Sequence, residues 1–178
     1  MCTMNEIEVK ILDIDRAAVE ARLGEIGAEL HSDELLSAFF FDFPDHRLGA
    51  AGRLLRLRRE GDRTFLTFKR RIGEEGAKIR EENEVMVSDF EVCRRVLVGL
   101  GLEETARVEK QRASYSLSGA TIAIDRHVGE LSFIPEFLEI EAGSVEELRA
   151  VAARLGFAAE ALRPWGLAQV IDYYRARS

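Results

Sequence analysis

The sequence predicts an α+β fold in which a largely antiparallel sheet closes into a barrel with helices packed outside. Most predicted strands follow one another through short turns, which favours antiparallel pairing. Charged and apolar residues alternate along these strands, so each strand has one charged face and one apolar face. The amphipathic helices need an apolar surface to pack on, and the apolar strand faces supply it. The charged faces are then expected to point into the barrel.

Composition limits the class of protein. The chain has 178 residues, 47% hydrophobic and 32% charged, which predicts one globular domain over residues 1–178. A net charge of -7 argues against binding to duplex nucleic acid or to an anionic membrane surface. Cys2 and Cys93 are too few for a disulfide framework or a metal cluster. Since no signal peptide or membrane-spanning run is recognisable, we expect a cytoplasmic protein.

The stretch 6–10 near the N-terminus combines two acids with a lysine. In a strand, Glu6, Glu8 and Lys10 share one face, and Ile7 and Val9 share the other. Two carboxylates at this spacing can hold a divalent cation, and the lysine can hold an anion that accompanies the cation. The alternative interpretation is an edge strand with a solvated charged face.

The first half of the chain contains most of the predicted strands. Asp13 or Asp15 is expected to cap a helix over 16–26. The aromatic run within 35–43 is predicted to be a strand whose phenylalanines belong to the core, and 47–52 is predicted to be a loop. Further strands are expected at 54–58, 64–69 and 80–87, joined by turns at 61–62 and 73–76.

The second half repeats the alternation of helices and strands. Ser88 with Glu91, and Ser144 with Glu147, have the spacing of capping boxes that begin helices. These helices are expected to end at the glycines 99 or 101 and 156. Between them, strands are predicted at 107–115, 121–125 and 137–141, and a last helix at 167–174.

Charged residues of both signs lie on the predicted inward faces. They are Glu6, Glu8, Lys10, Arg56, Arg58, Lys69, Arg80, Glu82, Glu84, Lys110, Arg112, Asp125, Glu139 and Glu141. A dry core cannot hold so many charges, because each unpaired buried charge costs several kcal/mol. The interior is therefore expected to be a solvated or ligand-filled channel, suited to a metal-bound polyphosphate.

These residues resemble a known family. The stretch 6–10 is similar to the Glu-x-Glu-x-Lys signature of the CYTH superfamily, the triphosphate tunnel metalloenzymes. Further similar blocks follow in the family's order at 41–45, 54–58, 68–69, 80–84, 109–115, 125 and 137–141. The Glu-Lys-Gln-Arg run at 109–112 and the Ile-Asp-Arg-His stretch at 124–127 most resemble the class IV adenylyl cyclase (CyaB-type) branch.

The resemblance implies an eight-stranded antiparallel tunnel that binds Mg²⁺ or Mn²⁺ and a triphosphate. It implies metal ligands at Glu6, Glu8, Glu139 and Glu141. It implies phosphate-binding residues at Lys10, Arg56, Arg58, Lys69, Arg80, Lys110 and Arg112. Glu82, Glu84 and Asp125 would orient the ligands, and Glu8, Lys10 and Lys69 would take part most directly in catalysis.

The resemblance leaves three functions open. The chain could hydrolyse or transfer phosphoryl groups of tripolyphosphate, ATP or thiamine triphosphate, cyclise ATP to cyclic AMP, or bind a polyphosphate without turnover. The class IV cyclases often carry a His-Phe pair before the signature and a basic-Ser-Tyr segment near the C-terminus. Here only residues 1–5 precede Glu6, and Pro164-Trp165-Gly166-Leu167 replaces the second segment. We therefore expect cyclisation to be weaker than hydrolysis, and a homodimer is left open.

Overall fold

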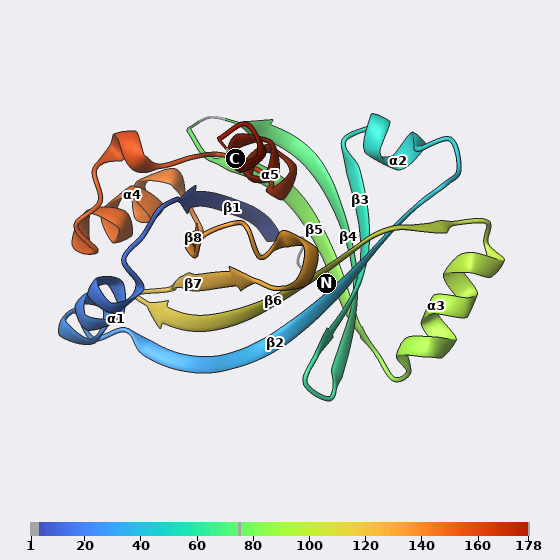
Figure 1. Ribbon diagram of the computed structural model, residues 1–178, viewed down its shortest axis with the longest axis horizontal. Coiled ribbons are helices and arrows are strands. Elements are labelled where there is room, and N and C mark those ends of the chain that lie inside the picture. Colours follow the sequence, from blue (N-terminus) through green and yellow to red (C-terminus); the bar gives the residue numbers. More distant parts are fainter. Residues whose placement is uncertain (1–3, 75, 178) are drawn as a thin grey trace.

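The strands form a closed antiparallel barrel, as the sequence predicted. The computed structural model describes residues 4–74 and 76–177, without the side chains of 4–6 and 74. The strands are β1 (Met4–Ile11), β2 (Glu29–Asp42), β3 (Arg53–Glu60), β4 (Arg63–Glu74), β5 (Lys78–Val87), β6 (Glu103–Leu117), β7 (Ala120–His127) and β8 (Phe137–Ala142). They pair in the order β1-β5-β4-β3-β2-β6-β7-β8, and β8 returns to β1 (Figure 1).

Helices surround the barrel. They are α1 (Arg16–Glu25), α2 (Arg47–Ala50), α3 (Phe90–Gly99), α4 (Val145–Arg154) and α5 (Leu167–Arg175), with short 3-10 turns at Gly129–Leu131 and Ala159–Ala161. In Figure 1, α1 and α4 lie at one end of the molecule and α3 at the other. In the described part of the chain, no helix is both long and apolar enough to cross a lipid bilayer.

The apolar core lies between the barrel wall and the helices. On one side, Val9 and Ile140 of the wall belong to a buried cluster with Leu23 of α1 and Leu148 of α4, all with no exposed surface. On the other side, Leu57 of the wall belongs to a second cluster that includes α3. Because the apolar faces are covered from outside, the alternate charged residues point into the barrel, which confirms the predicted orientation.

Several predicted helix boundaries are confirmed. Asp15 caps α1, since its carboxylate accepts a hydrogen bond from the Ala18 amide at 3.1 Å. Ser144 caps α4 through the Glu147 amide, also at 3.1 Å. The Glu147 carboxylate, however, accepts from the amide of Gly143 rather than of Ser144, so only half of that capping box forms.

Two local predictions are wrong. The loop predicted at 47–52 contains the helical turn α2, because the Asp42 carboxylate accepts hydrogen bonds from the Leu48 and Gly49 amides at 2.9 Å each. The second error is the cap of α3. Asp89, not Ser88, caps this helix, since its carboxylate accepts from the Val92 amide at 2.8 Å.

Most strands are longer than predicted. Strand β2 begins at Glu29 rather than at residue 35, because it pairs with β6 along its whole length, from Glu29 opposite Ser116 to Asp42 opposite Glu103. Strand β4 runs to Glu74, so Gly73, expected in a turn, lies in the strand next to an irregularity in register. Long-range pairing, rather than local alternation, sets these ends.

Candidate active site

Closure of the barrel brings the acids of the first and last strands together. Strand β1 pairs with β8 on one side, where Glu8 lies opposite Glu141 and Lys10 opposite Glu139. On its other side β1 pairs with β5, where Glu8 lies opposite Lys78. Stretches far apart in the sequence therefore build one wall of the interior.

Lys10 lies between two of these carboxylates. Its Nζ is 2.5 Å from Glu139 Oε2 and 3.6 Å from Glu8 Oε1. Burial alone would lower the pKa of Lys10, but the charges of Glu139 and Glu8 outweigh it and raise the pKa above its ordinary value. The lysine is therefore charged and compensates both acids in the structure.

Lys78 is a site residue that the sequence interpretation missed. Its ammonium donates to Glu8 Oε1, and the lysine side chain is only 12% exposed. Burial lowers the pKa of Lys78 in spite of the Glu8 charge, and the nearby charges of Lys10 and Arg80 act in the same direction. The signal was available, since Lys78 continues the alternation of Arg80, but the strand was predicted to begin two residues later.

A second group of charges surrounds Asp125, which has no exposed surface. The Arg112 guanidinium donates to both carboxylate oxygens of Asp125 at 2.6 Å, and Lys110 Nζ donates to one of them at 2.6 Å. Arg112 also donates to Glu139 Oε1 at 2.8 Å. This network links β6, β7 and β8 to Lys10 of β1, so the charges around Asp125 and those around Lys10 form one continuous system.

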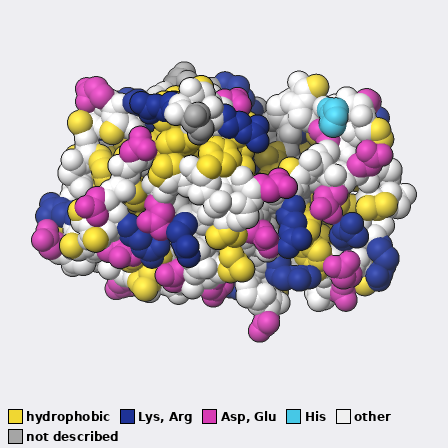
Figure 2. Space-filling model, in the orientation of Figure 1, with side chains coloured by type: hydrophobic (Ala, Val, Ile, Leu, Met, Phe, Trp, Pro, Cys, Tyr) yellow, Lys and Arg dark blue, Asp and Glu magenta, His cyan; other side chains and the backbone are white. Residues whose placement is uncertain are grey.

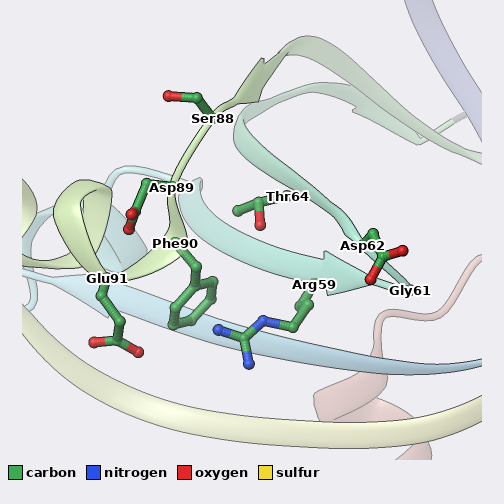
Figure 3. Close-up of a pocket in the computed structure, with 8 residues that line it drawn as sticks. All are labelled: Arg59, Gly61, Asp62, Thr64, Ser88, Asp89, Phe90 and Glu91. Atoms are coloured by element: carbon green, nitrogen blue, oxygen red, sulfur yellow. The ribbon is translucent and has the colours of Figure 1, made fainter.

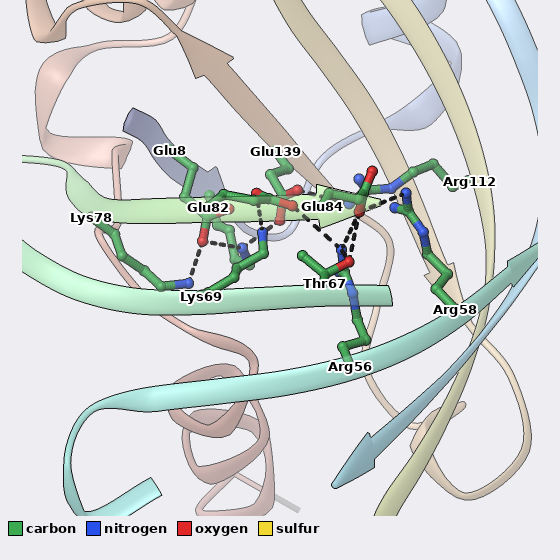
Figure 4. A network of polar contacts seen from close by, with 11 residues as sticks. Glu8, Arg56, Arg58, Thr67, Lys69, Lys78, Glu82, Glu84, Arg112 and Glu139 are labelled. Atoms are coloured by element: carbon green, nitrogen blue, oxygen red, sulfur yellow. Dashed lines mark hydrogen bonds and ion pairs between the residues drawn. The ribbon is translucent and has the colours of Figure 1, made fainter. Parts of the chain in front are cut away.

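The opposite wall carries two arginines with incomplete hydrogen bonding. Arg56 and Arg58 each reach Glu84 Oε2 at 3.5 Å, where Thr67 Oγ1 also donates at 2.6 Å (Figure 4). The Nε atoms of both arginines are buried and have no hydrogen-bond partner among the described residues. Burial lowers the pKa of Arg58, and the nearby positive charges of Arg56 and Arg112 act in the same direction. An anion would satisfy these donors.

Apart from Glu6, the remaining predicted residues also belong to the inward faces. Lys69 Nζ is 2.8 Å from Glu82 Oε2 (Figure 4), and Arg80 follows the same alternation along β5 as Glu82. Glu141 lies on the same face of β8 as Glu139. The side chain of Glu6 lies outside the described residues, although the backbone of Glu6 pairs with that of Arg80.

The acids offer the right donors for a metal ion but are held by lysines. Carboxylate oxygens are the ligands that Mg²⁺ and Mn²⁺ prefer. Among the side chains that the structure describes, no three His, Cys, Asp or Glu residues are arranged to hold a metal. Glu8 and Glu139 instead share Lys10. The donor chemistry thus fits a divalent cation, and a cation would compete with lysine for these carboxylates.

His127 is a second interior residue to which the sequence interpretation gave no role. It is 4% exposed, lies opposite Lys110 in the β6–β7 pairing, and stacks on Phe137 with ring centres 5.5 Å apart. Burial, with a smaller effect of the Lys110 charge, lowers the pKa of His127 to about 4, so the ring is neutral at pH 7. Its alternation with Asp125 along β7 was the signal that could have revealed it.

The molecular surface offers a less suitable site. An open hollow of about 440 Å³ lies between the β3–β4 turn and the start of α3, where the Arg59 guanidinium lies 4.4 Å from the centre of the Phe90 ring (Figure 3). None of the predicted site residues lines it. Figure 2 shows acidic and basic side chains intermingled over one face of the molecule. The charged barrel interior is therefore the stronger candidate.

Comparison with known proteins identifies the family. The model of the CYTH domain matches residues 4–165. The chain belongs to the CYTH family. A protein of Methanocaldococcus jannaschii named "Putative adenylate cyclase MJ0240" is 28% identical over 138 residues, 78% of this chain and 77% of that protein. This family assignment agrees with the resemblance derived from the sequence.

Solved structures share the fold of this CYTH chain. A conserved hypothetical protein from Pyrococcus furiosus, 27% identical, superposes with a TM-score of 0.76 over 93% of this chain and 99% of that one. The Hippeastrum protein HpAC1, described as a putative adenylyl cyclase with a dominant triphosphatase activity, is 18% identical. It superposes with a TM-score of 0.68 over 97% of this chain and 96% of its own.

Proposed function

We propose that this CYTH protein is a divalent-metal-dependent enzyme that acts on triphosphate substrates, by hydrolysis or phosphoryl transfer, inside the barrel. The observation that carries the proposal is the pair of buried Nε donors of Arg56 and Arg58, which have no hydrogen-bond partner among the described residues and are enclosed by the barrel with Arg112 nearby. Buried guanidinium donors without partners are costly, and phosphate oxygens are their natural acceptors.

Each charged group has a distinct proposed task. Glu6, Glu8, Glu139 and Glu141 would hold Mg²⁺ or Mn²⁺. Lys10, Arg56, Arg58, Lys69, Arg80, Lys110 and Arg112 would hold the phosphates. When bound, the metal supplies charge neutralisation and activation of the attacking oxygen. Glu82, Glu84 and Asp125 would orient the metal or the residues that bind the ligands, and the contacts of Lys69 with Glu82 and of Arg112 with Asp125 support the latter. Glu8, Lys10 and Lys69 would lie nearest the reacting phosphate.

Cyclisation of ATP is the second candidate reaction. The name of the M. jannaschii relative favours it, whereas the description of the Hippeastrum protein favours hydrolysis. Both reactions need the same metal and the same phosphate-binding residues, but cyclisation also needs the ribose 3′-oxygen held in line with the α-phosphorus. The replaced C-terminal segment 164–167 leads us to favour hydrolysis.

The two reactions are separated by their products. The protein is incubated with ATP, tripolyphosphate or thiamine triphosphate in Mg²⁺ or Mn²⁺, and the products are resolved. We expect phosphate release from at least one triphosphate at a rate above that of cyclic AMP formation. Cyclic AMP formed faster than any hydrolysis product would reverse this order. Binding without product in all six mixtures would leave the non-catalytic alternative.

Replacement of Arg58 tests the phosphate-binding role. Arg58→Ala is expected to weaken tripolyphosphate binding by about 1.5–3 kcal/mol, the range for a hydrogen bond to a charged group. Titration calorimetry with tripolyphosphate and with diphosphate measures the loss, which should be smaller for diphosphate if Arg58 holds a terminal phosphate. Arg149→Ala, in the outer helix α4, is the matched control. An equal loss in both variants would show that Arg58 acts only through bulk charge.

Lys110 is expected to make triphosphate binding depend on pH. Burial and the Arg112 charge lower the pKa of Lys110 to about 8, so its ammonium is present below that pH and is lost as the pH rises through it. Affinity for tripolyphosphate should therefore fall between about pH 7.5 and pH 9.5, by at most tenfold per pH unit for one proton.

The control for this pH dependence is Lys110→Arg, because arginine stays charged over the whole range. Ionisation of tripolyphosphate itself affects both proteins equally, so the difference between their profiles isolates Lys110. Parallel profiles for the two proteins would contradict a role for the Lys110 ammonium.

A further inference from the structure

Glu8 has more positive charge around it than one carboxylate needs. It accepts a hydrogen bond from Lys78 of β5, and its Oε1 also lies 3.6 Å from Lys10 Nζ. Lys10 has a second partner, because Glu139 lies 2.5 Å from its Nζ. Among the described residues, Glu8 is the only carboxylate that forms an ion pair with Lys78. Glu8 is thus the acid that Lys78 neutralises, while Lys10 is mainly neutralised by Glu139.

Lys78 is also confined to the interior. The C-terminal segment pairs with β1 here, since Lys10 and Arg163 exchange two backbone hydrogen bonds of 2.8 Å. Gly166 in this segment lies against Lys78, so that a β-carbon at Gly166 would be 3.7 Å from the Lys78 Nζ. If Lys78 lost Glu8 as its partner, the C-terminal segment would limit its path to solvent.

We propose that Lys78 is a displaceable counterion of Glu8 that couples metal binding to triphosphate binding. The proposal rests on the proposed function, in which Glu8 is a metal ligand. In the structure the Lys78 ammonium holds Glu8, as Figure 4 shows. A divalent cation bound to Glu8 releases this ammonium inside the barrel, where it becomes an additional donor for a phosphate oxygen.

Charge balance explains why the exchange favours a polyanion. A divalent cation adds two positive charges to a wall that keeps both lysines. The released Lys78 then lies near Lys10 and Arg80, whose charges already oppose its own. A triphosphate relieves this repulsion, so each ligand promotes binding of the other. By linkage, the factor by which the metal strengthens triphosphate binding equals the factor by which triphosphate strengthens metal binding.

The variant Lys78→Met tests the proposal, because methionine keeps an unbranched side chain and removes the charge. Without triphosphate, the variant is expected to bind Mn²⁺ several-fold more tightly, since nothing at position 78 competes for Glu8. At a fixed concentration of free Mn²⁺, the same variant is expected to bind tripolyphosphate about tenfold more weakly, the effect of one charge-assisted hydrogen bond. In metal-free buffer the loss should be smaller, because Lys78 is then occupied by Glu8.

The measurements are Mn²⁺ titrations followed by electron paramagnetic resonance, and tripolyphosphate titrations by calorimetry. Arg70→Met is the matched control. Arg70 is an exposed residue of the adjacent strand β4, and its guanidinium forms an ion pair with Glu81. The substitution removes one positive charge from the same hairpin and should change neither affinity. Circular dichroism and the melting temperature establish that both variants are folded, and Lys78→Arg, which keeps the charge, should retain the coupling.

The two affinities of Lys78→Met must move in opposite directions. Weaker Mn²⁺ binding, or equal tripolyphosphate losses with and without Mn²⁺, would overturn the counterion role while leaving the proposed function intact. A wild-type protein that binds neither Mn²⁺ nor tripolyphosphate would overturn both. If Lys78→Met does not fold, Lys78→Gln gives the same comparison.

Discussion

Glu8→Gln is expected to lower the rate of triphosphate turnover at least about 100-fold, which corresponds to about 2.7 kcal/mol of transition-state stabilisation. Glutamine has the size of glutamate, so the buried position remains filled. A neutral amide is a much poorer ligand than a carboxylate for a hard divalent cation. The expected loss of rate should therefore be accompanied by weaker binding of Mg²⁺ or Mn²⁺.

The matched control for this variant is Glu81→Gln. Glu81 lies on the same barrel wall but on the outer face of β5, where it pairs with Arg70. Rate and metal affinity are measured together for wild type and both variants. If Glu8→Gln keeps the wild-type rate at saturating Mg²⁺, Glu8 is not a metal ligand in the reaction.

Asp125→Asn is expected to be the most destabilising single change at the site. Asp125 has no exposed surface, and its carboxylate compensates the positive charges of both Arg112 and Lys110. Removing one partner of a buried ion pair leaves uncompensated charge, which typically costs about 3–5 kcal/mol. Urea unfolding of wild type and variant at pH 7 measures the difference in the free energy of unfolding.

Two further measurements separate this electrostatic cost from a packing defect. Burial would raise the pKa of Asp125, but the charges of Arg112 and Lys110 outweigh it and hold the pKa below its ordinary value. The stability that ionised Asp125 contributes is therefore present above about pH 4 and is lost as the pH falls. The difference in the free energy of unfolding between wild type and Asp125→Asn should accordingly become smaller in acid. Tripolyphosphate should also stabilise the variant more than wild type. A difference in the free energy of unfolding of under about 1 kcal/mol at pH 7, which is typical of an exposed ion pair, would contradict this role of Asp125.

The general architecture could be predicted because alternation is a local property of the sequence. Glu6, Glu8 and Lys10 alternate with apolar residues, and so do the residues around Arg56 and Glu139. Together with helices that need an apolar surface, this alternation indicates which faces point inward. The helix boundary at Asp15 could be predicted for the same reason, since capping depends on neighbouring residues.

The features that the sequence interpretation missed depend on distant contacts. Strand β5 begins at Lys78 because it pairs with β1 there, seventy residues away in sequence, and this pairing places Lys78 beside Glu8. The turn α2 forms around the Asp42 carboxylate. His127 acquires its altered pKa only from burial and from its neighbours in the barrel.

The sequence also indicated which charges face inward but not which of them form pairs. Lys10 and Arg112 were expected to hold phosphates, and in the structure they bind Glu139 and Asp125. Such pairs are chosen by distances across the barrel, which no local pattern contains. Binding of a metal-bound triphosphate would therefore replace existing ion pairs of Lys10 and Arg112, as well as satisfy the Nε donors of Arg56 and Arg58 that have no partner among the described residues.

A crystal structure of the protein with Mn²⁺ and tripolyphosphate tests the central claim most directly, since the anomalous scattering of manganese locates the metal independently of the phosphates. The account predicts manganese inside the barrel within coordination distance of Glu8 and Glu139. It also predicts phosphate oxygens within hydrogen-bond distance of the Nε atoms of Arg56 and Arg58. Manganese and tripolyphosphate bound only outside the barrel, with the Lys10–Glu139 and Lys78–Glu8 pairs unchanged, would contradict it.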